Sequence, residues 1–212
     1  MDKYTLPLED SKFYHIYNQG NNGENLYYND NNYNYFLKKL DLYLSDYIEV
    51  YAFCLMPNHF HLLVKVRAPE ELDEKLKETI AAYKPVRSSR PNRFEWHETY
   101  SQFISNQFRV FFMSYSKAIN KQTGRKGSLF REIFKRKEIT SLTYLQNTVV
   151  YIHRNPLHHG FEEDFRNYRW SSYERIMTDK ITKLKKQEVI EWFEDKENYR
   201  YMHLADIDDD IE

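Results

Sequence analysis

Two histidines separated by one residue, His59 and His61, are the first residues whose types and spacing allow chemistry. They stand in a β-favouring segment, where alternate side chains point to the same face and each residue advances the strand by ~3.3 Å. Both imidazoles are therefore expected on one face, with room for a divalent ion between them. The same spacing is common for two hydrogen-bonded or half-exposed histidines, so it does not establish a metal site by itself.

A second chemical pair lies in the segment 142–155, whose apolar residues recur at helical spacing. Its polar face carries Tyr144, Thr148, Tyr151 and Asn155, so the last two are neighbours one turn apart. A phenol hydroxyl and an amide oxygen can thus reach the same point. Two histidine nitrogens and one amide oxygen would leave metal positions open for a substrate phosphate. Because the chain has 19 tyrosines, an ordinary amphipathic tyrosine is the competing interpretation.

A packed core must position these residues, and the composition supports one. The 212 residues are 41% apolar and 17% aromatic, which excludes a disordered chain and suits one domain with or without an appendage.

The spacing of apolar residues predicts three strands, at 13–18, 48–56 and 59–66, and one or two short strands or an extended loop at 128–139. It predicts helices at 33–47, 69–83, 100–120, 141–155 and 186–193, and a loop at 84–98. Pro57 and Asn58 form a turn that makes a hairpin of the second and third strands, and Pro156 is expected to end a helix. We therefore expect an α+β domain with an antiparallel sheet and helices on one face.

The net charge of −1 conceals an uneven distribution along the chain. Residues 109–137 contain nine basic residues and one acidic residue, a net charge of +8, whereas the tail 205–212 contains five acidic residues and no basic one. The basic segment is either a solvated face or a surface for nucleic acid. The acidic tail either shields that surface or is disordered.

The single cysteine, Cys54, excludes an internal disulfide and a cysteine-only metal site, and it is expected to pack in the core of a protein from a reducing compartment. No apolar run approaches the ~20 residues that span a bilayer. The N-terminal residues do not have the pattern of a secretory signal. These features predict a cytoplasmic protein without a membrane segment.

Five segments, taken in order, resemble the signatures of the HUH single-tyrosine transposases, and in particular the REP-associated (repetitive extragenic palindrome) tyrosine transposases. They are Tyr14–Asn18, Cys54–Leu63, Gly124–Phe130, Tyr151–Pro156 and Tyr168–Tyr173. The most specific is Met-Pro-Asn-His-Phe-His at 56–61. The resemblance covers residues 12–173, and the long polar insertion at 68–99 departs from compact members of the family.

The resemblance implies a ferredoxin-like fold with a central antiparallel sheet. It implies His59 and His61 as metal ligands, Asn155 as the third ligand, Tyr151 as the nucleophile, and Mg²⁺ or Mn²⁺ as the metal. The implied activity cleaves and rejoins single-stranded DNA at hairpin-flanked sites through a 5′-phosphotyrosine intermediate. The expected DNA contacts, all in the basic segment, are Arg109, Lys117, Arg125, Lys126, Arg131, Lys135, Arg136 and Lys137.

The expected organisation is a transposase domain at 1–173, including the 68–99 insertion, followed by a C-terminal helical extension with an acidic tail at 174–212. The chain is expected to act as a monomer or a homodimer. The sequence leaves open whether the active site forms within one chain or between two. Trp170 and Tyr173 are expected to close the C-terminal segment over the core.

Two other functions stay open. One is a domesticated hairpin DNA-binding protein without strand-transfer activity. The other is a metal-dependent hydrolase that activates water, which the absence of a nearby Asp/Glu pair on the strand disfavours.

Tyr144 is the next candidate for the nucleophile. His153, His158 and His159 are expected to support the ligands or to face DNA rather than to form a second metal site.

Overall fold

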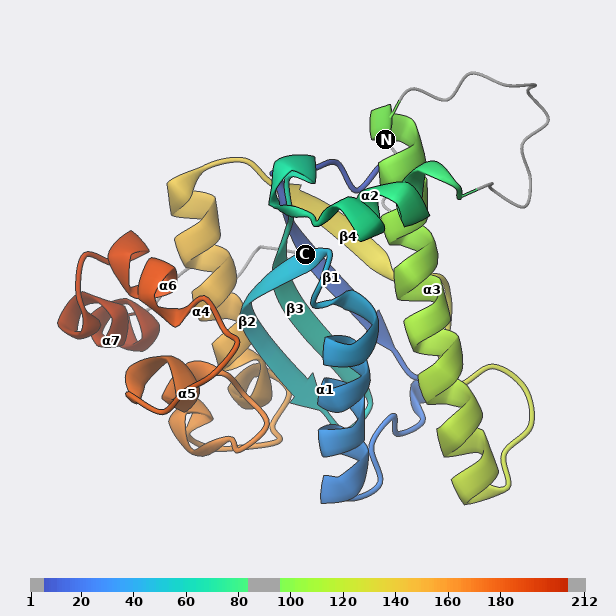
Figure 1. The fold of residues 1–212 in the computed structure, drawn as a ribbon. Helices are drawn as coiled ribbons and strands as arrows, with labels where there is room; N and C mark the ends of the chain where they lie inside the picture. Colours follow the sequence, from blue (N-terminus) through green and yellow to red (C-terminus); the bar gives the residue numbers. More distant parts are fainter. Residues whose placement is uncertain (1–5, 84–95, 206–212) are drawn as a thin grey trace.

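A single antiparallel sheet forms the centre of the molecule (Figure 1). The computed structural model describes residues 6–83 and 96–205. The sheet has the order β2-β3-β1-β4, and its strands are β1 (Phe13–Gln19), β2 (Ile48–Met56), β3 (His59–Val66) and β4 (Lys135–Ile139). Every neighbouring pair is antiparallel. The succession β-α-β-β-α-β is that of the ferredoxin-like arrangement, so the expected α+β class and antiparallel sheet are confirmed.

Seven α-helices lie in the described part of the chain. They are α1 (Asp30–Leu44), α2 (Glu74–Ala81), α3 (Trp96–Thr123), α4 (Leu142–His158), α5 (Tyr173–Met177), α6 (Lys186–Trp192) and α7 (Lys196–Leu204), with single 3-10 turns at Asn21–Gly23, Pro69–Glu71 and Phe165–Asn167. The sequence predicted five of these helices and missed α5 and α7. Residues 84–95 of the expected loop and the acidic tail from 206 onward lie outside the described residues, and 96–98 of that loop belong to α3, which begins four residues earlier than expected. Among residues 6–83 and 96–205, no helix combines the length and the apolar character needed to cross a membrane.

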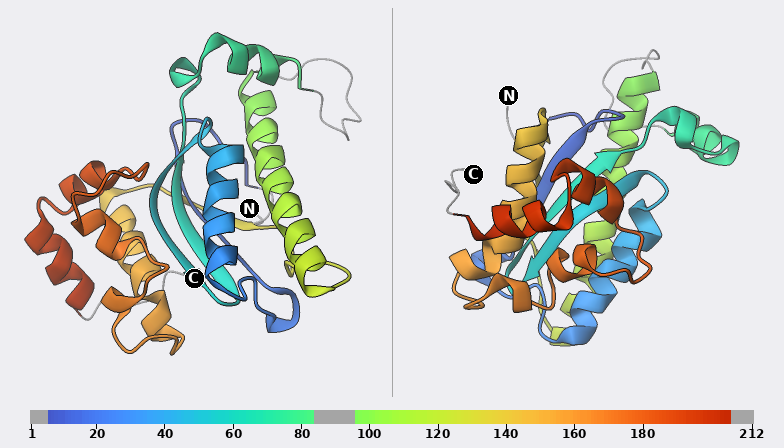
Figure 2. Two further views of the ribbon diagram at one scale, coloured as in Figure 1. Left: turned by 60° about the horizontal axis from the view of Figure 1, so that its bottom comes forward. Right: turned by 90° about the vertical axis from the view of Figure 1, so that its left-hand side faces the viewer.

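Helices cover both faces of the sheet, which corrects the expectation of one covered face (Figure 2). On one face, α1 and α3 pack against Phe60, Leu62 and Val64 of β3. On the other, α4 and the C-terminal helices pack against Cys54 of β2 and Leu63 of β3. The near-continuous apolar runs of β2 and β3 are typical of strands buried on both sides.

The C-terminal segment also covers the free edge of β2. The backbone N–H of Leu55 donates to the carbonyl of Trp170 at 3.0 Å, and that of Ser172 donates to the carbonyl of Phe53 at 2.9 Å. Trp170 packs in the core of the α1 face and Tyr173 in that of the α4 face. The expected closure of this segment over the core is therefore confirmed, and an unpaired sheet edge is avoided.

The helix α4 continues past Pro156, contrary to the expected stop, and ends at His158. Proline lacks only the N–H that would bond to Ile152, and this close to the helix end the following residues still find carbonyls. The N–H of His159 donates to Asn155 at 3.0 Å, and that of Phe161 donates to Pro156 at 2.8 Å.

The hairpin turn between β2 and β3 is held from the end of β1. The N–H of Gly20 donates to the carbonyl of Asn58 at 2.7 Å. A Cβ at this position would lie 1.9 Å from the carbonyl oxygen of Glu24, so only glycine fits. This contact fixes the turn immediately before His59.

Candidate active site

His59 and His61 lie on the α4 face of β3, as the alternation predicts. Their ring centroids are 5.4 Å apart. In the sheet register His61 stands between Cys54 of β2 and Tyr17 of β1, and it is only 3% exposed. The pair therefore sits where the sheet meets α4.

Tyr151 of α4 reaches His61 of this pair within the same chain. Its ring centroid is 5.5 Å from that of His61 and 5.9 Å from that of His15, in edge-to-face geometry with both. The alternative nucleophile Tyr144 stands two turns earlier, where its ring lies near the ammonium of Lys137. The fold thus brings the predicted nucleophile to the predicted ligands without a second subunit.

Hydrogen bonds fix which nitrogen of His59 carries the proton. Its Nδ1 lies 2.7 Å from Oδ1 of Asn58, an oxygen that can only accept, so Nδ1–H donates and Nε2 presents a lone pair. The pKa of His59 is lowered to about 4, chiefly because burial disfavours the charged ring; His159 acts in the same direction and the Asn155 side chain in the opposite one. The ring is therefore neutral at neutral pH.

His15 of β1 orients His61, a role that the sequence did not predict. The Nε2 atom of His15 is 2.8 Å from Nδ1 of His61. Burial lowers the pKa of His15 to about 3 with a contribution from Lys137, and burial together with nearby imidazoles holds the pKa of His61 well below its usual value. The available signal was a second alternating run, His15-Ile16-Tyr17, in a strand expected beside the first.

Asn155 and His59 each present a buried polar atom without a hydrogen-bond partner among the described residues. These atoms are Oδ1 of Asn155 and Nε2 of His59. Asn155 is fully buried, and its Nδ2 donates to the carbonyl of Tyr151 at 2.9 Å, which turns Oδ1 to the other side. Orphaned buried acceptors are costly, and a cation would satisfy both.

The donor set of His59, His61 and Asn155 fits a divalent cation with open positions. Within residues 6–83 and 96–205 no group of three or more His, Cys, Asp or Glu side chains is placed to hold a metal. The candidate set differs from such groups because its third member is an amide. Neutral imidazoles and an amide oxygen leave the full charge of the cation available to an anionic substrate.

A cavity of about 330 Å³ opens on the imidazole side of the site. Its lining includes both candidate histidine ligands, the aromatic ring of Tyr17 and the cations Arg131 and Lys135. Tyr151 is 6% exposed and is not among the lining residues. The carboxylate of Glu132 also lines the cavity, 3.9 Å from Arg131, so the lining is polar and its charged side chains carry a net charge of +1 (two cations and one anion).

The strand β4 divides its three basic residues between the two faces of the sheet. Lys135 stands opposite Tyr17 and Lys137 opposite His15, so both point to the face of the site. Arg136 points the other way and is 7% exposed, with its Nη1 donating to Ser105 of α3 at 2.7 Å. Arg136 is thus positioned to tie β4 to α3.

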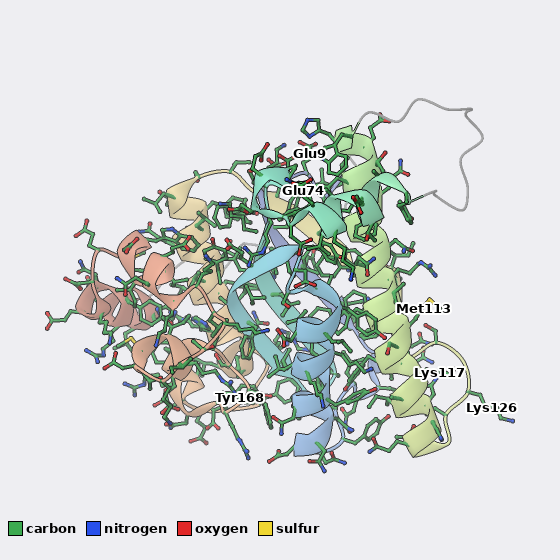
Figure 3. All side chains as sticks on the ribbon, in the orientation of Figure 1. Glu9, Glu74, Met113, Lys117, Lys126 and Tyr168 are labelled. Carbon is green, nitrogen blue, oxygen red and sulfur yellow. The ribbon has the colours of Figure 1, made fainter. Side chains whose placement is uncertain are left out.

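The other predicted DNA contacts are spread more widely. Arg131 lines the cavity. Arg125 pairs with Glu24 and bonds to Asn120 at the end of α3. Figure 3 shows Lys117 on the outer side of α3 and Lys126 on the loop beyond it. The basic segment, which includes Arg109 of α3, therefore does not form one continuous patch around the site.

The three histidines of α4 and its end have different surroundings. His159 stacks edge-on against His59 at 4.6 Å, and His158 lies 6.4 Å from Tyr151. His159 therefore lies beside a candidate ligand and His158 near the candidate nucleophile, and their roles stay predictions. His153 does not face DNA and does not contact the candidate ligands directly: it is fully buried on another side of α4 and bonded to Ser172 and His203.

Comparison with solved structures finds a similar fold. The chain matches a solved structure described as a REP-associated tyrosine transposase bound to a REP hairpin, with a TM-score of 0.57 and 16% sequence identity over 84% of this chain and 86% of the other. No protein-family model matches the chain, and the search of curated proteins finds no match either. The likeness establishes the shared fold.

Proposed function

We propose that this chain is a DNA strand transferase that cleaves and rejoins single-stranded DNA beside hairpins, with Tyr151 as the nucleophile. The observation that carries the proposal is the meeting of Tyr151 with His61 beside two orphaned buried acceptors, Nε2 of His59 and Oδ1 of Asn155. Support for DNA as the substrate comes from the fold shared with a transposase whose description names a bound hairpin.

In the proposed reaction the phenol oxygen of Tyr151 attacks the phosphorus of a DNA phosphodiester. The new bond joins this oxygen to the 5′ phosphate, the bond to the 3′ oxygen breaks, and the phenolic proton ends on the departing 3′ hydroxyl or on solvent. The covalent link conserves the phosphoester bond, so a 3′ hydroxyl can later reverse the step without a nucleotide cofactor.

The proposed cofactor is Mg²⁺ or Mn²⁺, held by His59, His61 and Asn155. When bound, a divalent cation would polarise the phosphate and favour the ionised phenol, whose ordinary pKa near ~10 makes it a poor nucleophile at neutral pH. Asn58 keeps His59 in the tautomer that offers a lone pair at Nε2. With His15 as the acceptor of the bond from Nδ1–H of His61, Nε2 of His61 would offer one too. Lys135 and Arg131 attract the DNA backbone to the cavity.

The test is a covalent adduct assay on a denaturing gel. The probe is a 3′-labelled pool of single-stranded oligonucleotides that carry a stem-loop with randomised flanks, incubated with Mn²⁺ or Mg²⁺. We expect the wild-type protein to form an adduct and Tyr151→Phe to form none, because the substitution removes only the attacking oxygen. Tyr144→Phe is the matched control on the same helix and should retain the adduct.

Binding of the same pool, measured by mobility shift, separates the alternatives. Tyr151→Phe should bind the DNA as wild type does. Binding without any adduct in the wild type would favour a hairpin-binding protein without strand transfer. Cleavage without an adduct would favour a hydrolase that uses water, and either result would refute the proposal.

A further inference from the structure

A chain of buried hydrogen bonds links the side of α4 that carries His153 to the C-terminal helices. His153 and His203 are fully buried, and Nδ1 of His153 lies 2.8 Å from Nε2 of His203. On its other side, Nε2 of His153 lies 2.7 Å from Oγ of Ser172. The chain joins α4, the segment before α5, and α7.

The direction of each bond in this chain follows from its ends. The carbonyl of Tyr199 can only accept, so Nδ1–H of His203 donates to it at 2.7 Å. Burial keeps both rings neutral, so Nε2 of His203 accepts from Nδ1–H of His153. Nε2 of His153 then accepts from the hydroxyl of Ser172, whose oxygen accepts from the N–H of Phe53 in β2 at 2.8 Å.

Two further bonds reinforce the same contact. Gln146 of α4 donates from Nε2 to the carbonyl of Trp192, and Arg154 of α4 donates from Nη1 to the carbonyl of Ala205. Gln146 is seven residues, about two turns, from His153 and lies on the same stripe of the helix, whereas Arg154 lies ~100° around the helix from His153. The C-terminal segment is therefore bonded to α4 at points about two turns apart along the helix.

The residues of the candidate site stand on the other side of the same turns. His153 lies between Tyr151 and Asn155 in sequence, and two residues correspond to ~200° around a helix. Side chains extend ~5–6 Å from a helix axis, so a roll of ~10° about that axis displaces their ends by ~1 Å. Displacements of this size are enough to cost roughly a hundredfold in rate.

We propose that the segment 172–205 is a clamp that fixes the roll of α4, and that His153 and His203 are positioning residues for Tyr151 and Asn155. The inference rests on the proposed function for its catalytic consequence. The clamp also predicts that the oxygen of Asn155 is held beside His59, and this structural prediction does not depend on the proposed function. The clamp explains why buried histidines, rather than apolar residues, occupy this core: their directional bonds define an angle that apolar contacts leave loose.

The test compares three variants. His203→Leu removes both bonds of the ring, His203→Gln restores an acceptor and a donor, and Val189→Ala weakens the same apolar core without touching the hydrogen-bond chain. The measurements are thermal stability, Mn²⁺ affinity by calorimetry, DNA affinity, and the rate of adduct formation at saturating DNA. Variants that lose the same thermal stability are compared, so an effect on Mn²⁺ affinity or adduct rate that is specific to the hydrogen-bond chain can be told from an effect of a less stable core.

We expect His203→Leu to slow adduct formation roughly 10–100-fold and to weaken Mn²⁺ binding, with DNA affinity unchanged. His203→Gln should recover most of the adduct rate and most of the Mn²⁺ affinity. Val189→Ala should lower the thermal stability with little change in the adduct rate or the Mn²⁺ affinity. Equal effects of Val189→Ala and His203→Leu, or no effect of His203→Leu on Mn²⁺ affinity, would overturn the clamp. If the wild type forms no adduct, the proposed function fails, and the Mn²⁺ measurements still decide on the clamp.

Discussion

At the scale of single residues, the site depends on where protons sit on its imidazoles. Asn58 holds the proton of His59 on Nδ1, and His15 contacts Nδ1 of His61. Nε2 of His59 is then the atom available to a metal, and Nε2 of His61 becomes available when His15 accepts the hydrogen bond from Nδ1–H of His61. The two residues that orient the imidazoles for metal binding are thus Asn58, in the hairpin turn, and His15, on the adjacent strand.

His15 gives a direct test of this arrangement. His15→Leu should weaken Mn²⁺ binding roughly 10–100-fold, because His61 loses the acceptor that orients it. His15→Gln, which keeps an acceptor oxygen, should bind closer to the wild type. Isothermal titration with Mn²⁺ measures both, and an unchanged affinity in His15→Leu would contradict the role.

The sequence predicted the pairs that follow from local periodicity. Alternation in β3 placed His59 and His61 together, and helical spacing placed Tyr151 beside Asn155. The role of His15 could not follow from spacing, because its partner is 46 residues away and only the register of the sheet brings them together. Periodicity is a local signal, whereas strand register is set by the whole core.

At the scale of elements, the ends of helices and the C-terminal segment were the least predictable. The sequence stopped α4 at Asn155 because proline breaks helices, but a proline in the last turn removes only one bond. The helices α5 and α7 are short and depend on packing: α5 lies against α6 and the turn at Phe165–Asn167, and α7 lies against α4, with Asp195 capping its first turn.

The edge strand β2 contains a buried carboxylate that should make stability depend on pH. The carboxylate of Glu49 is 2.7 Å from the ammonium of Lys185 and 3.1 Å from the guanidinium of Arg67. Burial acts to raise its pKa, but bonds from Lys185 and Tyr51 and the nearby positive charges outweigh it, so the pKa is lowered. A lowered pKa stabilises the fold above the unfolded value of ~4.3, and this stabilisation is lost as pH falls through the folded value.

Glu49→Gln should therefore reduce the free energy of unfolding by about 1–3 kcal/mol at neutral pH. The difference from the wild type should shrink as the pH falls below ~4.3, because the unfolded chain then binds a proton, and it should vanish at the lower pH where the native carboxylate, whose pKa is lowered, is protonated too. Urea unfolding across this range measures the effect, with the exposed Glu163→Gln as the matched control. A difference independent of pH would refute the electrostatic explanation.

At the scale of the whole molecule, the sheet separates two basic surfaces. Lys135 and Lys137 point to the face of α4 and the site, whereas Arg109 and Lys117 belong to α3 on the opposite face. In sequence these residues form one segment with a net charge of +8. The fold therefore divides a charge cluster that appears continuous in the chain.

This division predicts unequal contributions to DNA binding. Replacing Lys135 and Lys137 by alanine should weaken binding of single-stranded DNA and reduce the slope of log affinity against log salt by about 1.4, since each lost phosphate contact contributes ~0.7. Replacing Arg109 and Lys117 should change the slope much less. Fluorescence anisotropy over a series of salt concentrations measures both, and equal slopes for the two double variants would show that DNA also follows α3.

The central claim is that the phenol of Tyr151 becomes joined to DNA beside His59 and His61. The most direct measurement digests the purified wild-type adduct with protease and nuclease and identifies the modified residue by tandem mass spectrometry. We expect a single modified peptide, with the nucleotide phosphate on Tyr151. A nucleotide on Tyr17 or Tyr144, with Tyr151 unmodified, would contradict the account.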